Sequence, residues 1–190
     1  KKMVSLCVIT NDRPLIYDFI EWHKKYKFDR YVIFNNCSKD EDLFRIDGTE
    51  EIDARGLEAA QIKCYQSFID QLPLNDWVLF IDSDELLDLE GDIHDFLKPY
   101  TNCDTVRLNW KCYGDNGELR YREAPIWERF PEPCDDNVVY NDKLPQRNYR
   151  KLPRQMFLQT NFQTSTSRHS HTFDSWWMCC EYTNGTANCE

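Results

Sequence analysis

Short apolar runs alternate with amphipathic stretches over the first 110 residues of the chain. Three of these runs, Ser5–Thr10, Tyr31–Asn35 and Trp77–Ile81, are predicted to be strands. Ser5–Thr10 has the pattern of a buried strand, and Trp77–Ile81 gives the strongest strand signal in the chain. Between them, Ile16–Tyr26 and Glu58–Gln71 carry apolar side chains at helical spacing. Strands separated by helices of this length predict a mostly parallel sheet with helices on its faces, which is the α/β class.

Local signals mark where these elements begin and end. Asp12 can cap the first helix and Pro14 suits its first turn, whereas Pro73 ends the second helix. The side of the second helix predicted to be buried consists of Ala59, Ile62, Tyr65 and Ile69. The charged segment 41–57 is expected to be irregular, and Thr105–Trp110 is expected to be a further strand.

From residue 111 onward the regular spacing is lost, and prolines and polar residues become frequent. Short strands and loops are expected there, and loops of this kind commonly shape a substrate pocket. We therefore predict a single domain over residues 1–190, in which 1–110 is the scaffold and 111–190 shapes the pocket.

Composition and charge narrow the class of protein. Apolar residues make up 41% and aromatic residues 14% of the 190, which is enough to form a core. The formal net charge of −10 argues against nucleic acid as a partner, because phosphate contacts need an excess of Lys and Arg. The longest apolar run, Trp77–Ile81, is far short of the roughly 18 residues that span a bilayer, so we expect no transmembrane segment and a cytoplasmic location. The nine scattered cysteines are expected to be mostly reduced core thiols.

The chemistry centres on Asp82-Ser83-Asp84-Glu85, which follows the strand Trp77–Ile81 directly. Ligands of open α/β sheets bind outside the carboxyl ends of the strands. Two carboxylates one residue apart at such an end can share Mn²⁺ or Mg²⁺, which completes its coordination with phosphate oxygens and water. The motif therefore predicts a nucleoside diphosphate held through a metal that Asp82 and Asp84 bind. The alternative is a solvated turn at the end of a strand.

Several blocks of the chain, in order, resemble those of GT-A glycosyltransferases, and most closely those of family 92 (the DUF23 group). These blocks are Ile9–Asp12, Ile20–His23, Tyr31–Asp40, Trp77–Glu85, Asn109–Gly117 and Glu128–Phe130. The resemblance covers about residues 4–172. It departs at His23, which falls earlier than the helix histidine of the family, and at Thr10, where a lysine is commoner. A second resemblance is to the amino-terminal glycosyltransferase domain of chlorella-virus capsid-glycan proteins, which implies a compact viral or microbial enzyme within a longer, multidomain chain.

The resemblance implies a GT-A fold and a UDP-sugar donor whose sugar is moved, with inversion, to a glycan or glycoprotein acceptor. Glucose, galactose and a 6-deoxy sugar such as rhamnose remain open as the transferred sugar. Residues 1–110 would then bind the nucleotide sugar, and residues 111–190 would face the acceptor. Mn²⁺ or Mg²⁺ is the implied cofactor.

The resemblance also implies roles for individual residues. The donor nucleotide would be contacted by Thr10, Asn11, Arg13, Asn36, Gln61, Asp82, Ser83 and Lys151. His171, or else His169, would complete the metal shell with an imidazole nitrogen. Glu128, or else Asp115, would take the proton of the acceptor hydroxyl as the catalytic base.

For several of these residues a structural role is a comparable alternative. Asn36 is as well suited to capping a turn, and Gln61 to an exposed helix face. Lys151 suits a structural salt bridge, and the histidine pair suits a surface loop. Two other functions stay open: a haloacid-dehalogenase-type phosphatase, which also places Asp-x-Asp after an apolar strand, and a non-catalytic module that binds carbohydrate or metal.

Overall fold

A computed structural model of the chain describes residues 2–73, 76–101, 105–109, 113, 120–132 and 153–159. Within these residues, six strands form one sheet in the order β3-β2-β1-β4-β6-β5. The strands are β1 (Val4–Thr10), β2 (Arg30–Asn35), β3 (Glu50–Asp53), β4 (Trp77–Phe80), β5 (Thr105–Asn109) and β6 (Pro153–Gln159). The first four are mutually parallel, and β6 runs antiparallel to both β4 and β5.

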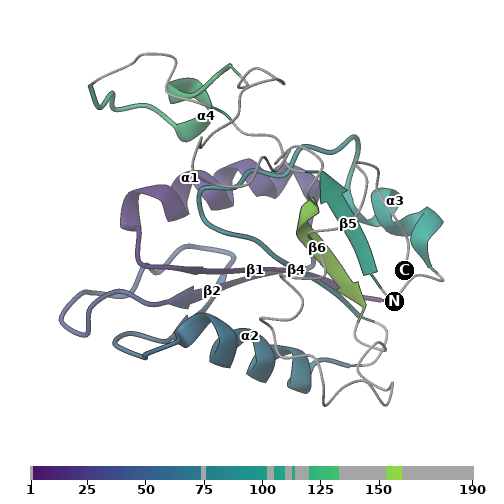
Figure 1. The fold of residues 1–190 in the computed structure, drawn as a ribbon, viewed down its shortest axis with the longest axis horizontal. Coiled ribbons are helices and arrows are strands. Elements are labelled where there is room, and N and C mark those ends of the chain that lie inside the picture. The colour runs from purple at the N-terminus through teal and green to yellow at the C-terminus, as the bar shows by residue number, and fades with distance from the viewer. Residues whose placement is uncertain are drawn as a thin grey trace, which may run out of the picture.

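The helices lie on both faces of this sheet (Figure 1). They are α1 (Arg13–His23), α2 (Ala60–Gln71), α3 (Ile93–Leu97) and α4 (Ile126–Arg129), with 3₁₀ turns η1 (Lys24–Tyr26) and η2 (Lys98–Tyr100). α1 and α3 cover one face and α2 covers the other, while α4 lies beyond α1. The predicted α/β class, a mostly parallel sheet flanked by helices, is therefore confirmed. No helix in the described part of the chain is both long and apolar enough to cross a membrane.

Two apolar clusters, one on each face, hold the helices to the sheet. Because successive side chains of a strand point to opposite faces, a strand that is apolar throughout contributes side chains to both clusters. In β1, Leu6 and Val8 pack with α1, whereas Cys7 packs with α2. In β4, Leu79 joins the first cluster and Val78 the second. The strands predicted from these two apolar runs are therefore confirmed, and the structure shows that each contributes to the core on both faces of the sheet.

The start of α1 is as predicted. The carboxylate of Asp12 accepts a hydrogen bond from the backbone N–H of Leu15 at 3.0 Å, and Pro14 lies in the first turn. The helix places Ile16, Phe19 and Ile20 in the core. A 3₁₀ turn then carries the chain to the buried Tyr26, where the predicted helix ends.

Two predictions about the segment 41–71 are wrong. The segment 41–57 is not irregular throughout, because Glu50–Asp53 forms β3 by pairing with β2; its charged side chains suit the edge of a sheet. In α2, Ile62 is exposed and Ala59 precedes the helix in a left-handed conformation. The buried stripe of α2 runs instead through Ala60, Tyr65, Phe68 and Ile69.

The remaining elements agree with expectation where the structure describes them. β4 ends at Phe80, one residue before the predicted boundary, but the Ile81 N–H still bonds to the Cys7 carbonyl at 3.2 Å. The expected strand over Thr105–Trp110 is β5, and Trp110 lies outside the described residues. The described cysteines, Cys7, Cys37 and Cys64, are free thiols, and the first two are buried. The division into a donor half and an acceptor half stays a prediction.

Candidate functional site

The order in which the strands are added to the sheet reverses at β1. From β1 the chain proceeds to β2 and β3 on one side, and β4 then pairs with the opposite edge of β1. Ligands of open α/β sheets bind in the crevice outside the carboxyl ends of the two strands at such a switch point. The residues that follow β1 and β4 are therefore the first candidates for a site.

A tight turn follows β4 at this position. The N–H of Glu85 donates to the carbonyl of Asp82 at 3.1 Å, and the Glu85 carboxylate accepts from the N–H of Asp82 at 3.3 Å. Two hydrogen bonds therefore close the turn over Asp82-Ser83-Asp84-Glu85. The Glu85 side chain is buried, Asp82 is half-buried and Asp84 is exposed. Glu85 thus stabilises the turn, while Asp84 is accessible from solvent.

Side chains from β1 and α2 meet this turn. The Thr10 hydroxyl lies 3.0 Å from the Ser83 hydroxyl and also accepts the Asp12 N–H at 3.0 Å. The Gln61 amide nitrogen, in the first turn of α2, lies 3.5 Å from the Asp82 carboxylate. The fold thus brings together four of the residues that sequence analysis selected, from three separate segments. Their contact with a nucleotide stays a prediction.

Tyr65 fixes the start of α2 against the end of β1. β1 extends past β4, and the Tyr65 hydroxyl accepts the Ile9 N–H at 3.0 Å beyond the last paired residue of β4. Burial raises the pKa of Tyr65 well above its ordinary value, so the phenol stays protonated. This contact holds Gln61, one helical turn away, beside Asp82.

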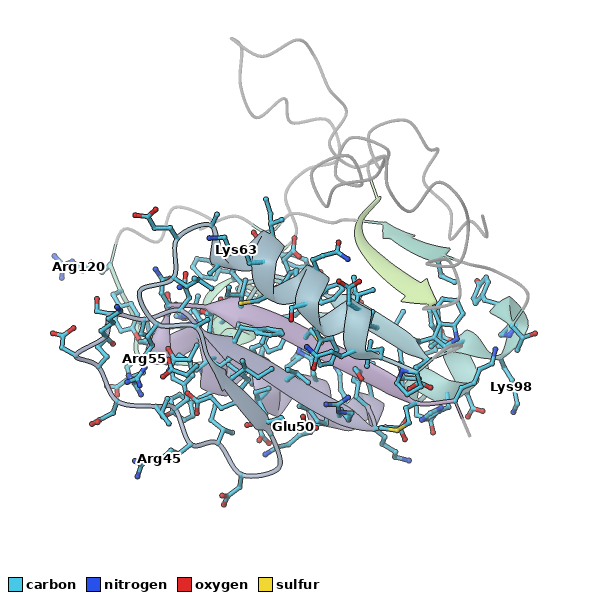
Figure 2. The ribbon with its side chains drawn as sticks, turned by 90° about the horizontal axis from the view of Figure 1, so that it is seen from below. Arg45, Glu50, Arg55, Lys63, Lys98 and Arg120 are labelled. Carbon is cyan, nitrogen blue, oxygen red and sulfur yellow. The ribbon has the colours of Figure 1, made fainter. Side chains whose placement is uncertain are left out.

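The segment between β2 and α2, which includes β3, starts beside the end of β1. Glu51 organises it, because its carboxylate accepts hydrogen bonds from the Asn35 side chain at 2.8 Å and from the N–H groups of Phe44 and Arg45 at 2.9 and 2.8 Å. Burial raises the pKa of Glu51, but these three bonds outweigh it and lower the pKa overall. Figure 2 shows the loop residues Arg45 and Arg55 at one end of the molecule, with Lys98 at the other.

Asn36, predicted to contact the nucleoside, braces this loop. Its side-chain amide donates to the carbonyls of Ala54 at 2.8 Å and Leu57 at 3.4 Å, and its N–H donates to the Thr10 carbonyl at 2.9 Å. These contacts are the ones expected of the alternative role of Asn36, which is to stabilise a turn. Nucleoside binding by Asn36 stays a prediction.

Arg13 and Asn11 also lie at the carboxyl end of β1. The Arg13 guanidinium donates to the Asp42 carbonyl at 2.5 Å, lies 3.9 Å from the Glu41 carboxylate and stacks 4.8 Å from the Phe44 ring centre. Asn11 is exposed, and its carbonyl accepts from the Cys37 thiol at 3.7 Å. Arg13 thus ties α1 to the loop after β2, and its role toward a diphosphate stays a prediction.

Glu128, the candidate base, lies on α4. This short helix packs on α1 through a hydrogen bond of 2.9 Å from the Ile126 N–H to Asp18 and through the Trp127 ring, 5.2 Å from that of Trp22. The Glu128 side chain is exposed, and its carbonyl accepts a hydrogen bond from Arg122. The other predicted residues, Asp115, Lys151, His169 and His171, lie outside the described residues.

Two features of the site were missed by sequence analysis. One is the turn-closing role of Glu85. A buried carboxylate needs hydrogen-bond donors, but Glu85 follows Asp84 directly, so the local sequence does not signal that this acid is buried. The other is a set of polar contacts from the end of α1 to the segment after the turn. The sequence signal for these contacts is His23, a polar residue on the apolar stripe of its helix.

Any binding of a metal ion at the turn depends on its two exposed or half-exposed carboxylates. In the described part of the chain, no group of three or more His, Cys, Asp or Glu side chains could hold an ion. The turn offers two carboxylates, Asp82 and Asp84. Mg²⁺ and Mn²⁺ are commonly held by one or two carboxylates plus substrate phosphates and water, so this pair fits such an ion when a diphosphate is also bound.

No protein-family model matches the chain, and no curated protein matches it significantly. Among solved structures, the chain is similar to 4-diphosphocytidyl-2C-methyl-D-erythritol synthase, with 9% identity and a TM-score of 0.45, over 85% of this chain and 77% of that one. It is also similar to the apo-form glycosyltransferase GlyE of Streptococcus pneumoniae TIGR4, with 12% identity and a TM-score of 0.39, over 94% of this chain and 39% of that one. At these TM-scores neither likeness bears on the activity of the chain. The fold class rests on the sheet order and the helices, and the resemblance to family 92 and to viral enzymes stays a prediction.

Proposed function

We propose that the chain is a metal-dependent glycosyltransferase that moves a hexose or 6-deoxyhexose from a UDP-sugar to a glycan acceptor. The observation that carries this proposal is the position of Asp82-Ser83-Asp84, in a turn at the switch point of the sheet and in contact with Thr10 of β1. A diphosphate bound in the crevice there would lie beside two carboxylates, which requires a cation between them.

Asp82 and Asp84 would hold Mn²⁺ or Mg²⁺, with His169 or His171 as a third ligand. When bound, the ion would neutralise the negative charge that develops on the departing diphosphate. The exposed Asp84 is the more accessible of the two carboxylates, and Gln61 orients Asp82 from α2. Glu85 would hold the turn in shape and is not assigned to the ion.

The nucleoside would lie against the loop after β2. Glu51 and Asn36 hold that loop with hydrogen bonds to five different groups, so its shape is largely set before a ligand arrives. Preorganisation of this kind lowers the entropic cost of binding. The preference for UDP comes from the resemblance to family 92, as does inversion at the sugar carbon.

Transfer itself needs one displacement. The acceptor oxygen would bond to the anomeric carbon as the bond from that carbon to the diphosphate breaks, and UDP would leave. The hydroxyl proton would pass to a carboxylate, for which Glu128 is the first candidate and Asp115 the second. Lys151 would offset charge on the leaving diphosphate.

The proposal is tested by UDP release from UDP-glucose, UDP-galactose and UDP-rhamnose, with Mn²⁺ and then with EDTA. We expect metal-dependent release by the wild type and a loss of more than about 100-fold in Asp84→Ala, because weakening the support of a metal ligand alone costs 10- to 100-fold. Asp95→Ala is the matched control, since Asp95 is exposed and pairs at 3.2 Å with Lys98 at the opposite end of the molecule (Figure 2).

Full activity of Asp84→Ala would contradict the metal role, provided that circular dichroism shows both variants folded. Hydrolysis of a generic phosphate ester without release of UDP would favour a phosphatase. Sugar or metal binding without either activity would favour the non-catalytic module.

A further inference from the structure

The segment that follows the Asp82–Glu85 turn has no helix or strand until α3 begins at Ile93. A segment without regular structure cannot satisfy its own backbone N–H and C=O groups, so other parts of the chain must supply partners when it is buried. Leu87, the second residue of this segment, is almost fully buried. Its backbone partners come from the end of α1 and from η1.

Three side chains, which we call the Leu87 clamp, surround this backbone: Trp22, His23 and Tyr26. The Leu87 carbonyl accepts two hydrogen bonds, one from the Trp22 indole N–H at 2.7 Å and one from the Tyr26 hydroxyl at 2.5 Å. The Leu87 N–H donates to Nε2 of His23 at 3.1 Å. The Leu89 N–H donates to the Tyr26 hydroxyl at 3.2 Å.

The clamp is itself rigid. Nδ1 of His23 donates to the Phe19 carbonyl at 2.7 Å, one helical turn back, which fixes the ring and leaves Nε2 as an acceptor. The rings of His23 and Tyr26 are almost fully buried, and the partly buried Trp22 packs against the core cluster that α1 forms with the sheet. Each hydrogen bond therefore joins the segment to a part of the molecule that cannot easily move.

The clamp acts on the site because of its place along the chain. Leu87 lies two residues after Glu85, whose carboxylate closes the turn. On the other side, Ile81 is held by the last bond of the sheet to Cys7. The turn that carries Asp82 and Asp84 is therefore held by the sheet at its start and by the clamp just after its end.

We infer that Trp22, His23 and Tyr26 are positioning residues of the donor site, holding the segment after the turn so that Asp82 and Asp84 keep the geometry needed for the metal–diphosphate pair. This inference rests on the proposed function. None of the three side chains is assigned to the ligand; each acts through the backbone of Leu87 or Leu89.

Tyr26→Phe tests the inference, because it removes the hydroxyl that makes two of the four clamp bonds and keeps the ring in the core. Tyr31→Phe is the matched control. The Tyr31 hydroxyl donates to the His23 carbonyl at 3.2 Å, so this variant also loses a tyrosine-to-backbone bond near the end of α1, but none to the segment after the turn. Two quantities are measured: amide hydrogen exchange at Leu89, and the calorimetric affinity for UDP with Mn²⁺, well below the melting temperature.

We expect faster exchange at Leu89 in Tyr26→Phe and a UDP affinity at least about fivefold weaker, the effect of losing roughly one hydrogen bond. Tyr31→Phe should bind UDP within about twofold of the wild type. A purely structural role would lower the melting temperature of Tyr26→Phe and leave the UDP affinity of the folded protein unchanged, which would overturn the inference alone. If the wild type binds no UDP with Mn²⁺, the proposed function fails and the inference fails with it.

Discussion

Acid should destabilise this protein through one buried histidine. His23 is completely buried, and Nε2 accepts the Leu87 N–H while Nδ1 donates to the Phe19 carbonyl. Protonation of Nε2 would put its new N–H opposite the Leu87 N–H, and two donors cannot form a hydrogen bond with each other. Burial, as the largest cause, lowers the pKa of His23 to about 4, with the Phe19 hydrogen bond opposing the shift and the charge of Lys25 adding to it.

The size of the effect follows from linkage. An unfolded chain has a histidine pKa of about 6.5, so between that value and about 4 the unfolded state binds a proton that the native state does not. The contribution of His23 is therefore fully present above pH 6.5 and is lost as the pH falls through this window. At about 1.4 kcal/mol per pKa unit, the total loss is about 3 kcal/mol, of which about 2 to 3 kcal/mol is reached by pH 4.5.

Urea unfolding of the wild type and of His23→Gln, at pH 7.5, 6.0 and 4.5, measures this loss. Acid also protonates carboxylates whose pKa is lowered in the native state, such as Glu50 and Glu51, but it does so in both proteins. The difference between the two free energies of unfolding therefore isolates His23. The free energy of unfolding of the wild type minus that of His23→Gln should fall by about 2 to 3 kcal/mol from pH 7.5 to pH 4.5. A difference that stays constant with pH, or a wild-type His23 that titrates near 6.5 by NMR, would refute the argument.

Two further predictions concern stability. Glu51→Ala should lower the free energy of unfolding in urea by about 2 kcal/mol, because its carboxylate accepts three hydrogen bonds, whereas Glu50→Ala, which breaks a partly exposed ion pair with Arg30, should cost less than about 1 kcal/mol. Equal losses in the two variants would count against a special role for Glu51. Asp12→Ala should cost about 1 kcal/mol in thermal unfolding, because Asp12 caps α1 through the Leu15 N–H, and Asp12→Asn should restore most of it. An unchanged melting temperature in Asp12→Ala would show that the cap contributes nothing.

The scaffold could be predicted from sequence because its strands are apolar on both faces and its helices begin and end at clear signals. Asp12 and Pro14 at the start of α1 are an example. β3 could not be predicted, since its charged residues have no strand pattern of their own and become a strand only by pairing with β2. Ile62 was misplaced because it lies at the margin of the apolar stripe of α2, where spacing alone does not decide burial.

The candidate site was predictable where a rule of topology applied. Asp82 and Asp84 lie at the carboxyl end of a strand, as their position after an apolar run indicated. The contact between Thr10 and Ser83 joins residues 73 positions apart, and no local pattern specifies it. The same holds for His23, for which helical spacing predicts burial but not its bond to Leu87, 64 positions away.

The central claim is that the turn after β4 binds a nucleoside diphosphate through a divalent metal. Calorimetric titration of the chain with UDP and with GDP, first with Mn²⁺ and then with EDTA, tests it most directly. The account predicts that UDP binds in the presence of Mn²⁺, that GDP binds far more weakly, and that EDTA abolishes binding. Equal UDP binding with Mn²⁺ and EDTA, or no binding of either nucleotide, would contradict it.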